Sequence, residues 1–151
     1  MLLGNAFRSG IYIVIINLLM TYVALPIFNK KGLGSKSSAK IEACNKKYIV
    51  LNGGVDFVVV FLAVIFGKLL HIGKPSNAAF ALKCAAFAIV LHLLISWTMS
   101  TGLGLQKRVK TNPNAPDILN NLILLEECKH DNLGLSVLFI GVMAFLAVLL
   151  S

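Results

Sequence analysis

Three ionisable residues lie inside long apolar runs of the 151-residue sequence: Asp56, Lys83 and His92. In hydrocarbon such a residue usually faces a helix bundle or a water-filled cavity, so these positions are the first candidates for chemistry. Asp56 and His92 lie at similar depths, about 10 Å and about 9 Å from the same end of neighbouring antiparallel helices. We therefore expect the two side chains to lie within direct or single-water hydrogen-bonding reach. Such a pair could be a proton relay, a ligand-binding pair or a structural contact.

Lys83 has a simpler interpretation, because it lies only about five residues from the end of its run. A lysine in that position can extend its ammonium group to the interface, so we interpret it as an anchor. The sequence contains no H-E-x-x-H, G-x-S-x-G or P-loop motif and no repeated Cys/His metal spacing. It therefore indicates no metal site, and it leaves any catalytic residue unknown.

The composition indicates a membrane protein. Hydrophobic residues make up 58% of the chain and charged residues 13%, against about 25% charged in soluble domains. Four apolar runs each reach the length of about 20 residues that a helix needs to cross the hydrocarbon layer. Their unbroken length favours helices over barrel strands. We predict an all-α, multi-pass integral membrane protein, a four-helix bundle in a single domain over residues 1–151, with spans at about 11–28, 49–70, 78–98 and 133–150.

Small and polar residues recur on one face of each of the first three predicted spans. Such residues let membrane helices approach closely and form hydrogen bonds, so they predict a bundle, within one chain or between several. The three faces consist of Gly10, Val14, Asn17, Thr21 and Ala24; of Asn52, Asp56, Val60, Ala63 and Gly67; and of Ala81, Ala85, Ala88, His92 and Ser96.

The segments between the runs carry most of the charge. Segment 29–48 is rich in lysine and serine, and segment 99–132 is the longest connection. Within the latter, apolar residues of DILNNLILLEECKHD recur at helical spacing, which predicts a short amphipathic helix on the membrane before the last span. Pro26 lies near the end of the first span, where a proline is tolerated because a helix can break as it leaves the membrane.

Ten of the 14 Lys and Arg residues lie in segments 29–48 and 99–132. The positive-inside rule places both segments in the cytosol and both termini on the other side. Cys44 and Cys128 are thereby assigned to the reducing side, where disulfides are rare. The same rule explains the net charge of +8. We therefore expect lipid headgroups of the bilayer, rather than nucleic acid, as anionic neighbours.

Residues 20–100 resemble the membrane-associated proteins in eicosanoid and glutathione metabolism (MAPEG) in the segments NKKGLG, IEACNKKYIVLN and GKPSNAA and in the LH dipeptide of the third span. The resemblance implies a four-helix homo-oligomer, a trimer in that family, and an enzyme that conjugates or isomerises lipophilic substrates with glutathione. In the family pattern Arg-x-x-x-Asn-x-x-Glu, Asn52 matches the Asn, Lys47 or Tyr48 stands near the Arg, and Asp56 lies one residue after the Glu. The resemblance thus implies a glutathione site at Lys46, Lys47, Tyr48, Asn52 and Asp56.

A second resemblance, to cornichon cargo receptors, is carried by IEACN at 41–45 and PDILNN at 116–121. It implies a non-enzymatic adaptor, or an accessory subunit of a larger membrane complex, with partner contacts on the segments between the spans. The sequence leaves open whether the chain is an enzyme. The expected location is an endomembrane such as the endoplasmic reticulum in a eukaryote, and the cytoplasmic membrane otherwise.

Overall fold

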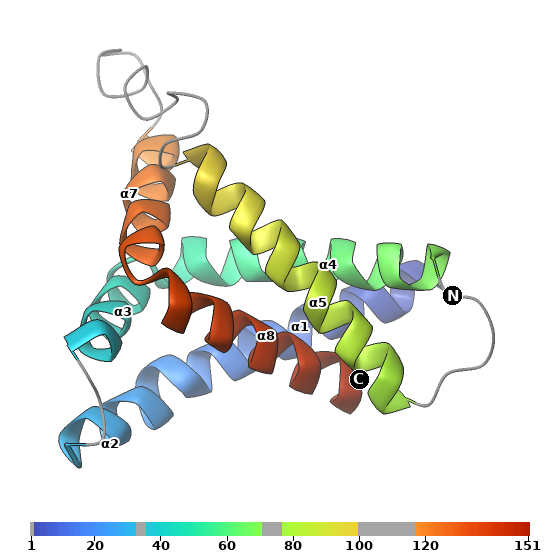
Figure 1. The fold of residues 1–151 in the computed structure, drawn as a ribbon, viewed down its shortest axis with the longest axis horizontal. Coiled ribbons are helices and arrows are strands. Elements are labelled where there is room, and N and C mark those ends of the chain that lie inside the picture. The colour runs from blue at the N-terminus through green and yellow to red at the C-terminus, as the bar shows by residue number, and fades with distance from the viewer. Residues whose placement is uncertain (1, 33–35, 71–76, 100–116) are drawn as a thin grey trace.

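The computed structural model describes the chain in four stretches: residues 2–32, 36–70, 77–99 and 117–151. All regular structure in these stretches is helical. Four of the helices are long and apolar enough to cross a membrane (Figure 1). The first, Leu2–Lys30, comprises α1 (Leu2–Leu19), η1 (Met20–Ala24) and α2 (Leu25–Lys30). The other three are α4 (Ile49–Leu69), α5 (Asn77–Trp97) and α8 (Leu133–Leu150). The all-helical prediction is confirmed, and the last three helices lie within a residue or so of the predicted spans.

The first helix begins earlier than predicted and ends close to its predicted end. It begins at Leu2 rather than near residue 11, since the earlier turns also bury Ala6 and Ser9 against the bundle. It continues through Pro26 to Lys30, two residues beyond the predicted end at about residue 28. The preceding segment Met20–Ala24 is a wider π turn, in which the Leu25 N–H donates to the carbonyl of Met20. A wider turn relieves the clash that a proline ring makes with the preceding helical turn.

The four long helices pack as a ring, in which α1 and α5 each contact both α4 and α8. The small-residue faces predicted for α4 and α5 are confirmed, because all ten of their residues are buried. On α1, Gly10 lets the ring of Phe57 approach so closely that an added Cβ would lie 2.5 Å from it. The core cluster consists mainly of alanine and valine, with Ile13, Cys84, Ile140 and Met143 among them, and small residues of this kind allow close helix–helix contacts.

Two further helices, α3 (Lys36–Lys47) and α7 (Asp117–Asp131), lie across one end of the ring (Figure 1). We call them the cap. The helix predicted before the last span is present as α7, and its position on the membrane surface stays a prediction. In contrast, α3 was expected only as a charged connector. It is helical because Ser38, Ile41 and Asn45 recur at helical spacing and are buried. Asn29 of α2 anchors α3 by accepting a hydrogen bond from Ser38 and donating one to Glu42.

A disulfide joins Cys44 of α3 to Cys128 of α7, with 6.6 Å between the Cα atoms. The assignment of both cysteines to a reducing compartment did not anticipate this bond. The two residues are 84 positions apart, and their proximity depends on the folding of α3 and its docking against α7. The spacing of the two cysteines in the sequence predicts neither the folding of α3 nor its docking.

The opposite end of the bundle holds both termini (Figure 1). The hydroxyls of Ser9 and Ser151 lie 2.8 Å apart there, and Arg8 donates to the Ser151 carbonyl. The Lys83 ammonium donates to the carbonyl of Leu70 at 2.9 Å, at the end of α4. A cation in this position complements the negative end of the helix dipole.

Candidate functional site

A small polar cavity lies beneath the cap, where five helices meet. Its volume is about 20 Å³, which is room for about one water molecule. The polar residues lining it come from α3, α4, α5, α7 and α8: Asn45, Asn52, Asp56, His92, Lys129 and Ser136. All six are buried. Buried polar groups are costly unless they are paired, so the contacts of each one decide what the cavity can do.

Asp56 is held by α1 and by the cap. Its Oδ2 accepts a hydrogen bond of 2.9 Å from the Asn17 amide, and its Oδ1 lies 3.9 Å from the Lys129 ammonium. Asn52 and Thr21 both donate to Asn17 Oδ1, each at 3.3 Å. These two donors fix the Asn17 amide so that its N–H faces Asp56, which orients the carboxylate toward Lys129.

Lys129 is shared by a second carboxyl group. Glu126 lies one turn earlier on α7, with its Oε1 3.9 Å from the Lys129 ammonium. The Glu126 side chain is fully buried, and neither of its oxygens has a hydrogen-bond partner among the described residues. Burial raises the pKa of Glu126, Lys129 opposes this rise, and the charge of Asp56 adds to it. We call Asp56, Lys129 and Glu126 the carboxyl–lysine cluster.

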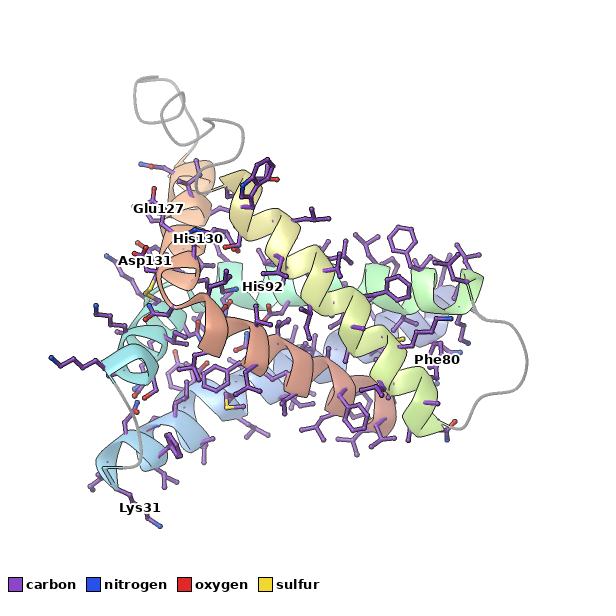
Figure 2. All side chains as sticks on the ribbon, viewed as in Figure 1. Lys31, Phe80, His92, Glu127, His130 and Asp131 are labelled. Atoms are coloured by element: carbon purple, nitrogen blue, oxygen red, sulfur yellow. A yellow bond between two sulfur atoms is a disulfide. The ribbon has the colours of Figure 1, made fainter. Side chains whose placement is uncertain are left out.

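His92 lines the same cavity from α5. Its Nε2 lies 2.8 Å from the hydroxyl of Ser136 on α8, and the side chain lies inside the bundle (Figure 2). Its Nδ1 has no hydrogen-bond partner in the described part of the chain. Asp56 makes its contacts with Asn17 and Lys129, and no hydrogen bond joins it directly to His92. The expected link through a single water therefore stays a prediction.

The fold separates into two groups the five residues at which the MAPEG resemblance implies a glutathione site. Asn52 and Asp56 line the polar cavity, whereas Lys46, Lys47 and Tyr48 do not. Lys46 and Lys47 are exposed on the last turn of α3, and Tyr48 is the residue that joins α3 to α4. A cavity with room for about one water is too small for a tripeptide. A glutathione site built on all five would have to extend outward over this corner.

Lys46 at that corner already has partners. It donates to Glu42 at 2.8 Å and lies 5.9 Å from the centre of the Tyr22 ring. The hydrogen bond from Lys46, followed by that from Asn29, lowers the pKa of Glu42. This pair is exposed to solvent and contributes little to stability.

Sequence reasoning missed Lys129 and Glu126 as site residues, because both were counted with the charge of a connecting segment. A signal was present, since Ile123, Glu126 and Lys129 follow one another at intervals of three residues and are all buried. A charged pair that continues an apolar stripe of a helix indicates partners elsewhere in the fold. No group of three or more His, Cys, Asp or Glu side chains in the described stretches is suited to hold a metal ion.

No protein-family model matches this chain, and neither a curated protein nor a solved structure matches it. The resemblances to MAPEG proteins and to cornichons are therefore predictions from the sequence. Functional reasoning depends on the cavity and the residues around it.

Proposed function

We propose that this chain is a multi-pass membrane protein that takes up and releases a proton at the carboxyl–lysine cluster. The observation that carries the proposal is that Asp56 and Glu126 share the single ammonium group of Lys129 in a buried site. With all three groups ionised the cluster has a net charge of −1, and one bound proton makes it neutral. A medium of low dielectric constant favours the neutral state.

The surface of the bundle supports a location in lipid. Large apolar side chains are exposed along the long helices, for example Leu82 at 65% and Leu138 at 57% exposure. A soluble monomer rarely exposes apolar patches on this scale. Ionisable groups inside such a bundle are typical of proton pathways in membrane proteins.

The cavity supplies a second proton carrier. His92 and Asp56 both line it, and one water in that space would connect a carboxyl group with an imidazole. An imidazole ring has two nitrogen atoms, so it can accept a proton at one of them and release a proton from the other. In this function Glu126 and Asp56 hold the proton, Lys129 sets the charge of the cluster, and His92 passes the proton on.

Infrared spectroscopy of the purified protein in lipid nanodiscs tests the proposal. We expect the C=O band of a protonated carboxyl group to persist above the pH at which exposed carboxyl groups ionise, because burial raises the pKa of Glu126. Glu126→Gln should remove or shift this band. Glu42→Gln is the matched control and should leave it in place, since Glu42 is outside the cluster and its pKa is lowered. If every carboxyl group titrates in the ordinary range, the proposal is wrong.

Glutathione-dependent chemistry is a second candidate, supported by the exposed ammonium groups of Lys46 and Lys47 at the corner between α3 and α4. Cationic groups there could pair with the carboxylates of the tripeptide. Calorimetry with millimolar glutathione should then show saturable binding that Lys47→Gln weakens. Absence of binding would remove the main support for a transferase or isomerase. If proton uptake is absent as well, the adaptor role remains, with the cap as the partner surface.

A further inference from the structure

Each helix of the cap contributes one residue to the wall of the polar cavity, and each of these residues is adjacent in sequence to a cysteine of the disulfide. Asn45 of α3 and Lys129 of α7 both line the cavity and are buried. Each directly follows a residue of the disulfide, Asn45 after Cys44 and Lys129 after Cys128. The covalent bond therefore joins the two helices at the point where they cover the carboxyl–lysine cluster.

The disulfide is open to attack from outside. A second cavity, of about 360 Å³, lies on the outer side of the cap and is lined by both cysteines together with Lys40, Glu127 and Asp131. Glu127 and Asp131 project from the side of α7 away from α5 (Figure 2). Both cysteines are partly exposed. A small thiol can therefore reach a sulfur atom without unfolding the bundle, which is the access that thiol–disulfide exchange requires.

The distribution of basic residues predicts on which side of the membrane this disulfide lies. The cap belongs to segments 29–48 and 99–132, which together hold ten of the 14 basic residues and which the positive-inside rule assigns to the cytosol. Disulfides on the cytosolic side are usually transient and act in catalysis or redox sensing. A bridge on this side, at a site that covers a buried charged cluster, has the features of a regulatory bond rather than a permanent one.

We infer that the Cys44–Cys128 disulfide is a redox latch, which a low-molecular-weight thiol opens to admit water to the carboxyl–lysine cluster. The inference rests on the proposed function, since it assigns a regulation to the same site. The thiolate of the reductant attacks one sulfur and forms a mixed disulfide, and the other cysteine leaves as a thiolate that takes up a proton. A second thiol then releases the first cysteine. Two thiols are oxidised to one disulfide, and the cysteine pair gains two electrons and two protons.

Opening has a defined structural path. Asn132 joins α7 to α8, and its side chain donates to the carbonyl of Cys128. Rotation of α7 about Asn132 would carry Lys129 away from Asp56 and expose both carboxyl groups. The latch thus couples the redox state of the cap to the charge balance of the cavity.

Hydrogen exchange measured by mass spectrometry tests the latch on the wild-type chain in nanodiscs, with and without dithiothreitol. Reduction should add two hydrogen atoms to the intact mass and accelerate exchange in α7 by about tenfold or more, while amides in the middle of α4 remain protected. The variant Cys44→Ser/Cys128→Ser should exchange rapidly in α7 without reductant and should not respond to it. Cys84→Ala, which removes the buried free cysteine, is the control and should respond like the wild type.

The infrared titration, repeated on the reduced protein, separates this inference from the proposed function. Faster deuterium exchange of the protonated carboxyl group after reduction supports the latch. Complete reduction with unchanged exchange in α7 overturns the latch and leaves proton binding standing. Free thiols at both Cys44 and Cys128 in protein purified without reductant also overturn it. If α7 opens but no carboxyl group titrates above the ordinary range, the proposed function is wrong while the cap still opens on reduction.

Discussion

Replacing Lys129 with methionine removes the ammonium group that contacts both Asp56 and Glu126. Both nitrogen–oxygen distances are 3.9 Å. At an effective dielectric constant of about 20, an ionised pair at this distance contributes about 4 kcal/mol of attraction, and with Glu126 protonated that pair is Asp56–Lys129. Methionine has a similar length and fills the same volume, so packing is largely retained. The main effect is to leave two buried carboxyl groups without a cation.

We expect Lys129→Met to lower the free energy of unfolding by about 3 to 5 kcal/mol, as is usual when one partner of a buried ion pair is removed. Asp56→Asn should also be destabilising, since it leaves Lys129 with Glu126 alone. The double variant should lose less than the sum of the two single losses, by about 1 to 3 kcal/mol. The reason is that the second change removes a group that the first had already deprived of its partner.

Unfolding in mixed micelles of increasing dodecyl sulfate content, followed by circular dichroism, measures these free energies. Lys83→Met is the matched control, because Lys83 donates to the Leu70 carbonyl at the other end of the bundle. Its replacement should cost below about 1 kcal/mol. Strictly additive losses for Lys129→Met and Asp56→Asn would refute the reasoning, because they would show that the two side chains do not interact.

Three further outcomes follow from the same contacts. In the folded state the pKa of Glu126 is raised, so between its ordinary and its raised pKa the folded chain binds more protons than the unfolded chain. The free energy of unfolding should therefore fall as the pH rises through this window, and Glu126→Gln should remove the fall. Gly10→Leu should destabilise by about 1 to 3 kcal/mol, since even a Cβ meets the ring of Phe57, and thermal unfolding by circular dichroism will detect it. For Asp56→Leu and His92→Leu, a double-mutant cycle in detergent should show a combined loss smaller than the sum if one water links the two groups, whereas additivity would mean that they act separately.

The sequence was sufficient for those features that depend on local composition. The length of each apolar run determines where α4, α5 and α8 lie, and the small-residue faces of α4 and α5 are the faces that the bundle buries. The depth of Asp56 and His92 along their helices predicted that both would be buried, and each is at most 2% exposed.

The partners of these residues were not predictable in the same way. Depth along a helix does not determine which neighbour a side chain meets, because that depends on how each helix is rotated about its axis. Asp56 contacts Asn17 and Lys129, whereas His92 contacts Ser136. The helix α3 and the disulfide escaped prediction for a related reason, since both depend on docking between segments far apart in the chain.

The π turn of the first helix contributes to the alignment of its buried side chains. Asn17, Thr21 and Leu25 are all buried and follow one another at intervals of four residues. In a regular α-helix, side chains four residues apart drift by about 40° around the axis, so three of them would span about 80°. The wider turn at Met20–Ala24 reduces that drift and keeps the three nearer to one line along the bundle.

This stretch can therefore lose a residue at lower cost than the rest of the bundle. Deleting one residue such as Val23, which is exposed, would convert the π turn into a regular α-helical turn, in which the Leu25 N–H can still bond to the Met20 carbonyl. Asn29, which anchors α3 through Ser38 and Glu42, would keep nearly the same orientation toward the cap. The same deletion in the regular helix α4 would rotate the following turns by about 100° relative to the bundle. An in-frame deletion of a single codon at position 22 or 23 should therefore be tolerated, whereas one in the middle of α4 should act as strongly as the loss of a core residue.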